Sequence, residues 1–186
     1  MVTVIGPRDK SQDDYVINVT SRSKTWSRGL SPFFLGPIKL YGNHIAQNVE
    51  NGWQYSKVYA QHADENQNPT DEYWEWAKSG WDNERAVRYP MAKGSKPLYC
   101  LWNNEKLGYI ESKRKVYVPL YSNAVKDTEE FSKLKKLYKT FGKLRLWDFD
   151  AYNHRALGLN WEDVMSCETK KYGHGMVLAM LLEGYL

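Results

Sequence analysis

The alternation of apolar and polar positions predicts a few short strands. Residues 15–21, YVINVTS, alternate β-branched and polar side chains, as strands with one buried face do. Residues 37–42 form a second such segment that ends in a glycine, and the pattern returns at residues 143–150. Residues 1–14 mix glycine, proline and both charges, which predicts a flexible lead-in. The strands are few enough to form a small sheet.

Helical spacing accounts for most of the remaining chain. Thr70, followed by Asp71 and Glu72, has the composition of a helix N-terminus. The segments expected to be helical are residues 49–62, residues 70–81, a segment from about residue 104 that Pro119 kinks or ends, residues 128–141, a short segment after Asn160, and residues 175–186. The sequence therefore predicts an α+β fold that is predominantly helical, with a small sheet and a single domain over residues 15–186.

Composition describes a globular protein without a membrane segment. Apolar residues make up 42% and charged residues 26% of the 186 positions, which is ordinary for such a protein. The longest apolar run, residues 176–182, is too short to cross a bilayer. Cys100 and Cys167 lie far apart and form no CxxC motif, and no signal peptide is evident. We therefore expect a cytoplasmic protein with no membrane partner.

Aromatic content and charge bear on the ligand. Eight Trp and 14 Tyr raise the aromatic share to 15%, and such side chains fill cores but also stack on bases and sugars. The net charge of +4 is compatible with a phosphate-bearing ligand but does not establish one. Lysines concentrate in residues 106–143, where a solvated helix face and a phosphate-binding face both explain them.

Motif searches return weak signals for catalysis and for metal binding. Asp148 and Asp150 lie two apart, so on a strand they would share a face and could divide acid and base work. His154 and His174 could join them in a metal site, but the spacing matches no metal motif, and we expect no metal or cofactor. Residues 171–175, KYGHG, resemble a phosphate-binding turn before a helix but lack the dinucleotide and P-loop patterns.

A polar stripe in residues 49–57, VENGWQYSK, is the strongest local feature. Glu50, Gln54 and Lys57 are spaced by four and three residues, which places them on one face of a helix. Spacing alone fits a solvated ion pair as well as the wall of a pocket.

This stripe resembles the core motif of the NADAR family, whose name reflects its association with NAD and ADP-ribose. That motif has Glu, an aromatic three residues later, Gln at four and Lys at seven, which correspond to Glu50, Trp53, Gln54 and Lys57. Asn51 stands where the family usually has His.

Other segments resemble the family in the same order along the chain. LSPFFLGPIKL is similar to an upstream segment and supplies Ser31 and Phe33, and RYPMAKGSKPLYCLW is similar to a basic segment that ends in Trp102. DFDAYN resembles an Asp-containing segment and supplies Asp150, although Asn153 and the histidine after it replace the family's Trp-Gly. The matches span residues 17–182.

The resemblance implies an N-glycosidase with a NADAR-like fold. It would hydrolyse the N-glycosidic bond of a ribosylated or ADP-ribosylated base or nucleotide, and ADP-ribosylated nucleic acid is a further substrate that the resemblance allows. Glu50 and Asp150 would be the catalytic carboxylates. The residues that the resemblance implies for substrate binding are Gln54 for ribose or base edges, Lys57 and Arg88 for phosphates, Trp53 and Trp102 for stacking, and Ser31 and Phe33 for lining the site.

Two other classes of function remain open from the sequence. The same fold could bind ADP-ribose or a nucleotide without turning it over. The lysine-rich segment and the many aromatic residues could instead bind nucleic acid, with an affinity that falls steeply with salt. The oligomeric state does not follow from the sequence.

Overall fold

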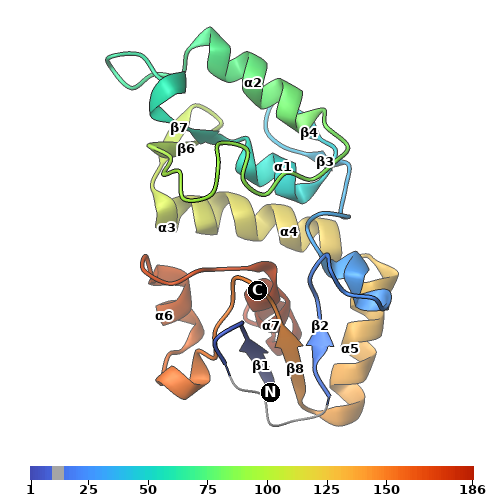
Figure 1. The fold of residues 1–186 in the computed structure, drawn as a ribbon. Coiled ribbons are helices and arrows are strands. Elements are labelled where there is room, and N and C mark those ends of the chain that lie inside the picture. The colour runs from blue at the N-terminus through green and yellow to red at the C-terminus, as the bar shows by residue number, and fades with distance from the viewer. Residues whose placement is uncertain (10–14) are drawn as a thin grey trace. The chain divides into compact units, whose positions relative to one another are not determined.

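A computed structural model describes residues 1–9 and 15–186 and confirms a helix-rich α+β fold (Figure 1). The chain divides into two compact units, which are described separately: unit 1 comprises residues 1–34 and 121–186, and unit 2 comprises residues 35–120. The single domain over residues 15–186 and the likeness to the NADAR fold stay predictions. In the part of the chain that the structure describes, no helix combines the length and the apolar character that a bilayer span requires.

Unit 1 is built on a parallel sheet in the order β1-β8-β2. Its strands are β1 (Val2–Ile5), β8 (Leu144–Trp147) and β2 (Ile17–Asn18). The register sets Val2 beside Leu144 and Val4 beside Leu146, and these four buried side chains share one face of the sheet. Helix α7 lies against β1 and β8 on that face (Figure 1).

The first strand corrects the predicted lead-in. Residues 2–5 alternate as VTVI and are paired along their whole length with β8, where we expected a flexible segment. Burial of the valines in the core outweighs the nearby glycine and proline that suggested flexibility. Residues 10–14 of the same predicted lead-in lie outside the described residues.

Two helices of unit 1 begin at their predicted caps, Thr128 and Asn160. The helices of this unit are η1 (Trp26–Leu30), the end of α4 (Val118–Val125), α5 (Glu129–Phe141), η4 (Arg155–Leu157), α6 (Trp161–Ser166) and α7 (His174–Glu183). The Thr128 hydroxyl accepts a hydrogen bond from the Phe131 amide at 3.2 Å, and α5 ends at Gly142, whose φ of 66° a glycine adopts without strain. The predicted helices at residues 128–141, after Asn160 and near residues 175–186 are confirmed.

The Glu183 carboxylate ties four elements of unit 1 together. It accepts hydrogen bonds from the Val2 amide at 2.7 Å and the Trp161 indole at 2.8 Å, and Arg155 Nη2 donates to its two oxygens at 2.8 and 2.7 Å. These bonds join β1, α6, η4 and the end of α7.

His154 packs beside this cluster as a buried neutral side chain. It is 1% exposed and its ring lies 4.0 Å from that of Trp161. Burial, assisted by the positive charge of Arg155, lowers the pKa of His154 from 6.5 to about 4.

Unit 2 contains two small antiparallel sheets. The first pairs β3 (Ile38–Lys39) with β4 (Ile45–Ala46), and the second has the order β5-β6-β7, with β5 (Lys57–Val58), β6 (Tyr99–Trp102) and β7 (Glu105–Leu107). Its helices are α1 (Val49–Gln54), η2 (Ala60–His62), α2 (Asp71–Trp81), α3 (Tyr109–Ser112) and the π turn η3 (Lys113–Tyr117), which leads into α4. The predicted helix at residues 70–81 is confirmed.

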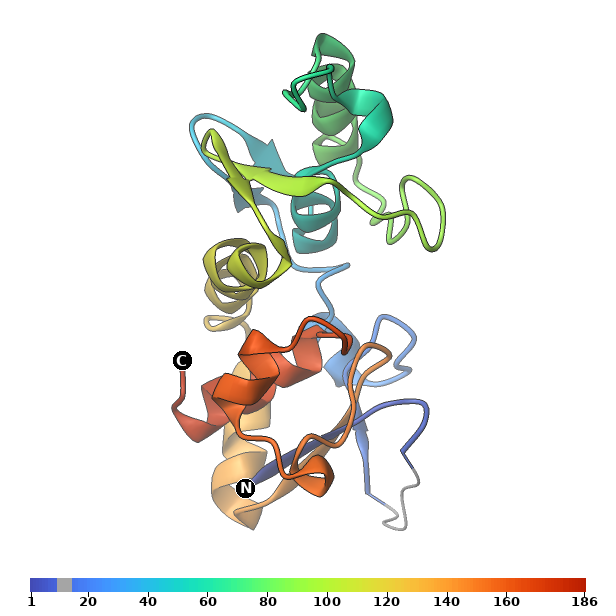
Figure 2. The ribbon, with the colours of Figure 1, turned by 90° about the vertical axis from the view of Figure 1, so that its left-hand side faces the viewer.

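A β-hairpin occupies the place where a helix from about residue 104 was expected. Asn103 and Asn104 both have positive φ, 48° and 68°, which fits the two-residue turn between β6 and β7 (Figure 2). The helix starts instead at Tyr109. Pro119 neither ends nor interrupts it, because the π turn η3 lies just before the proline, where a regular α-helical hydrogen bond would be lost.

Aromatic side chains form the core of unit 2 between α2 and the sheet. Tyr55, Tyr73, Trp81 and Tyr99 are all buried there. Gly80 faces Tyr55 so closely that a methyl group on Gly80 would overlap the Tyr55 ring. Close approach of α2 to the end of α1 therefore depends on a glycine at this position.

Replacing Gly80 with alanine should destabilise the protein. Alanine favours helices, but the overlap with Tyr55 forces a shift in a packed core, so we expect a net loss of about 1–3 kcal/mol in the free energy of unfolding. Denaturant titration measures it, with Ser79→Ala on the exposed side of α2 as the control. A Gly80→Ala protein as stable as Ser79→Ala would contradict this packing.

His154 should make the protein lose stability in acid. Its pKa in the folded protein, about 4, lies below its ordinary value of 6.5, so the unfolded chain takes up the proton first. The stabilisation is complete above pH 6.5 and is lost as the pH falls toward 4, by about 3 kcal/mol in all. Urea titrations between pH 7 and 4 should show a flatter pH dependence for His154→Gln. Parallel pH profiles for the two proteins would refute this assignment.

Candidate functional site

Helix α1 presents the predicted motif but is shorter than expected. Asn48 caps it by accepting a hydrogen bond from the Asn51 amide at 2.9 Å, and the helix ends at Gln54, whereas we expected it to reach about residue 62. The Ser56 hydroxyl donates to the Gly52 carbonyl at 2.7 Å, and the chain then pairs with β6 as strand β5. Sheet pairing therefore takes over where helical spacing predicted a further turn.

The side chains of Glu50, Gln54 and Lys57 nevertheless form one series of hydrogen bonds. The Gln54 amide nitrogen donates to Glu50 Oε1 at 2.9 Å, and Lys57 Nζ donates to Gln54 Oε1 at 2.7 Å. Glu50 is 6% exposed, so its carboxylate is almost completely removed from solvent. This series of hydrogen bonds extends from the first turn of α1, past the end of that helix, to the first residue of β5. The interpretation of this stripe as a fully solvated helix face is wrong for Glu50.

The Trp53 ring contacts Lys57, the last side chain of this hydrogen-bonded series. Lys57 Nζ lies 4.6 Å from the centre of the Trp53 ring, and the Trp53 ring also packs against that of Tyr117, with 5.2 Å between the ring centres. These contacts orient Lys57 toward Gln54. Stacking of Trp53 on a base and phosphate binding by Lys57 stay predictions.

Asn51 is a site residue whose role the sequence analysis missed. Its side chain is fully buried, and its amide donates to the carbonyls of Asn83 at 2.8 Å and Arg85 at 3.0 Å. Its side-chain oxygen accepts from the Val87 amide at 2.8 Å. The amide thus fixes the loop of residues 83–87 on α1 beside Glu50. The sequence signal was that Asn51 stands where the NADAR motif usually has His.

Arg88 follows the clamped loop directly. It is half-buried, and its guanidinium carbon lies 5.3 Å from the centre of the Tyr89 ring. Because Val87 is bonded to Asn51, the chain delivers Arg88 at a fixed point near α1. The sequence predicted Arg88 as a phosphate contact, and that role stays a prediction.

Trp102 shares a face of the β5-β6-β7 sheet with Lys57. Lys57 is the cross-strand neighbour of Cys100, and Trp102 lies two residues further along the same strand. The Trp102 ring is half-buried and packs edge-on against Tyr41 at 4.9 Å.

Burial raises the pKa of the Cys100 thiol to about 12, so this cysteine, which lies on the same strand, stays protonated and is a poor nucleophile.

Ser31 and Phe33 belong to unit 1. Ser31 is 1% exposed, and its hydroxyl accepts from the Phe33 amide at 3.4 Å in a turn after η1. Phe33 is half-buried. Ser31 therefore stabilises a turn, and its predicted contact with substrate stays a prediction.

The two aspartates after β8 do different work. Asp148 is 3% exposed, and its Oδ2 accepts from the Gly175 amide at 2.9 Å and lies 3.3 Å from His174 Nδ1. Asp150 is 30% exposed and pairs with Lys171 at 3.1 Å. Both follow the end of the strand, so the expected shared strand face is wrong.

The KYGHG turn receives a carboxylate of the protein itself. Asp148 occupies the anion-binding position at the N-terminus of α7, which removes the interpretation of this turn as a phosphate site. His174 also bonds the Val19 carbonyl through Nε2 at 2.8 Å. Over residues 1–9 and 15–186, no three His, Cys, Asp or Glu side chains cluster as metal ligands would.

A family-model comparison matches residues 8–156. The chain belongs to a family of unknown function, DUF6939. The matched region contains α1, the loop that Asn51 holds, Trp102 and Asp150, and it excludes α6 and α7. No curated protein matches the chain. Family membership assigns no activity, so the resemblance to the NADAR family stays a prediction.

Exchanging the Asn51 amide should release the loop. Asn51→Asp keeps the size of the side chain but turns a carboxylate toward the Asn83 and Arg85 carbonyls, which should cost about 2–4 kcal/mol in the free energy of unfolding. Hydrogen exchange at the Val87 amide should accelerate with it.

The matched control is Asn43→Asp, which makes the same charge change at an exposed position of unit 2. It should leave both measurements at wild-type values. If Val87 exchanges equally slowly in Asn51→Asp and Asn43→Asp, the loop is held by other contacts.

Proposed function

We propose that this protein is an N-glycosidase that hydrolyses the bond between ribose and the nitrogen of a base in a ribosylated or ADP-ribosylated nucleotide. The observation that carries the proposal is the buried Glu50 carboxylate, held by Gln54 and Lys57 in the segment that resembles the NADAR core motif. The proposed site of action is the cytoplasm, and the proposed activity needs no cofactor.

A carboxylate suits the chemistry of this bond. Cleavage passes through a state in which the sugar carbon carries positive charge, so a fixed negative group beside it lowers the barrier. Glu50 would supply that charge or activate the attacking water. Its burial strengthens both effects, because electrostatic interactions are larger away from solvent.

Gln54 and Lys57 orient the carboxylate. The Gln54 amide donates a hydrogen bond to it, and the Lys57 ammonium polarises the amide that donates this bond. We therefore give Lys57 a positioning role through Gln54, beside its predicted contact with phosphate.

The loop and the sheet face would bind the rest of the substrate. Arg88, held near α1 through the Asn51 clamp, would pair with phosphate oxygens. Trp102 shares the sheet face of Lys57 and would stack on the base or the adenine. The family resemblance alone supports Asp150 as a second carboxylate, so it is tested separately.

Glu50→Gln should reduce turnover by a factor of about 10²–10⁴, because the amide cannot supply the charge that the reaction requires. The substrates are DNA that carries ADP-ribosylated guanine and an early ribosylated intermediate of the riboflavin pathway. Product release is followed by chromatography. The control Glu65→Gln changes an exposed carboxylate of unit 2 and should retain full activity.

Three further measurements complete this test. Asp150→Asn shows whether the second carboxylate contributes. Lys57→Met should lower turnover by about tenfold through the weakened Gln54 hydrogen bond. A wild-type protein that binds ADP-ribose tightly but releases no product from either substrate would favour a non-catalytic binding module and overturn the glycosidase proposal.

A further inference from the structure

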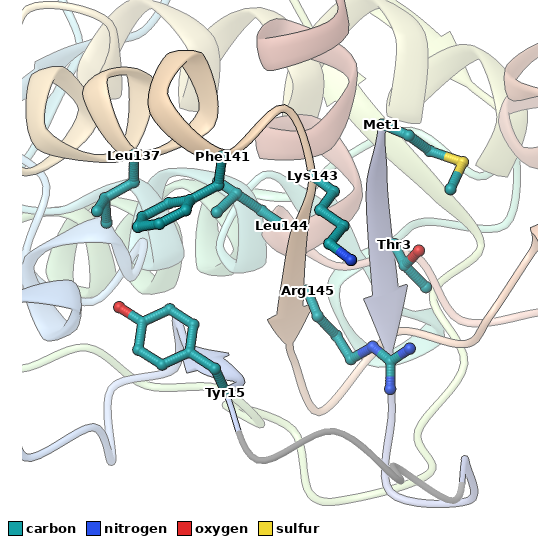
Figure 3. A pocket seen from close by; sticks show the side chains of 8 residues that line it. All are labelled: Met1, Thr3, Tyr15, Leu137, Phe141, Lys143, Leu144 and Arg145. Atoms are coloured by element: carbon teal, nitrogen blue, oxygen red, sulfur yellow. The ribbon is translucent and has the colours of Figure 1, made fainter.

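A hollow lies in unit 1, on residues that the proposed function does not use. It has a volume of about 680 Å³ and is bounded by the C-terminal turns of α5, the start of β8, β1 and Tyr15, which lies two residues before β2. Its lining residues are Met1, Thr3, Tyr15, Leu137, Phe141, Lys143, Leu144 and Arg145 (Figure 3). This volume is within the range of pockets that hold small organic ligands.

One side of the hollow is apolar and unusually open to solvent. Leu137, Phe141 and Tyr15 gather there in Figure 3. Phe141 is 60% exposed and Tyr15 is 64% exposed. Exposed large apolar side chains that converge on one concave site, rather than lying scattered, are typical of a place where an apolar partner binds.

The other side of the hollow carries positive charge. Lys143 lies just before β8, Arg145 is the second residue of that strand, and Thr3 is the cross-strand neighbour of Arg145 on β1. In Figure 3 their side chains lie together, opposite the aromatic rings. Thr3 adds a hydroxyl that can donate to an anion.

We propose that this hollow binds a small amphipathic anion. Its carboxylate would meet Lys143, Arg145 and Thr3, and its acyl or aryl body would pack on Leu137, Phe141 and Tyr15. The division of the lining into one cationic and one apolar side selects for this class over neutral lipids, which lack the charge, and over inorganic anions, which lack the apolar body.

Decanoate, below its micelle concentration, is the probe, and calorimetry on the whole protein measures its dissociation constant. We expect saturable binding of one decanoate for each chain. Lys143→Glu should weaken binding by about tenfold or more, because it replaces attraction with repulsion at an exposed residue. Phe141→Ser should also weaken binding, and because the Phe141 side chain is exposed, this substitution leaves the core intact.

Matched controls separate this site from general affinity for fatty anions. Lys139→Glu makes the same charge change on α5 outside the hollow and should bind decanoate like the wild type. Decanol, the neutral analogue, should bind at least about tenfold more weakly than decanoate. Equal weakening by Lys139→Glu and Lys143→Glu, equal binding of decanol, or binding of phosphatidylglycerol vesicles with no binding of monomeric decanoate would overturn the proposal.

Discussion

Burial of the Glu50 carboxylate is the constraint that organises unit 2 around α1. A charged group removed from water is tolerated when neighbours supply hydrogen bonds and opposite charge. Gln54 and Lys57 do so in series, and Trp53 holds the lysine in place through its ring. Because Lys57 belongs to β5 rather than to the helix, the pairing of β5 with β6 also determines the geometry of the carboxylate.

Asn51 extends this constraint to the loop that precedes Arg88. The side-chain amide of Asn51, the residue next to Glu50 on α1, donates to two main-chain carbonyls and accepts from one main-chain amide within residues 83–87. An arginine-bearing loop is thereby held beside the carboxylate on one six-residue helix. The proposed activity would use the carboxylate for the sugar and the arginine for phosphate.

The sequence predicted the fold class and most helices because their caps are local. Thr128 and Asn160 mark helix starts through neighbouring residues alone. It failed where pairing between distant segments decides the outcome. Strand β1 exists because β8 pairs with it, and α1 ends early because β6 takes up the following residues.

The spacing of Glu50, Gln54 and Lys57 predicted that these side chains lie together, and they do form one hydrogen-bonded series. Their geometry was not predicted, because Lys57 belongs to β5 and not to the helix. The role of Asn51 could not be predicted, since its partners are carbonyls more than thirty positions away in the sequence. The same holds for Asp148, whose place at the start of α7 depends on a return of the chain.

The central claim is that ribosylated nucleotides bind at the buried Glu50 carboxylate. The most direct measurement is the NMR spectrum of the Gln54 side-chain amide while Glu50→Gln protein is titrated with ADP-ribose. The Glu50→Gln substitution removes turnover and keeps a side chain of the same size in the site. The account predicts saturable shifts of the Gln54 amide and of the Trp102 indole. Shifts confined to residues of unit 1, with the Gln54 amide unmoved at saturating ADP-ribose, would contradict it.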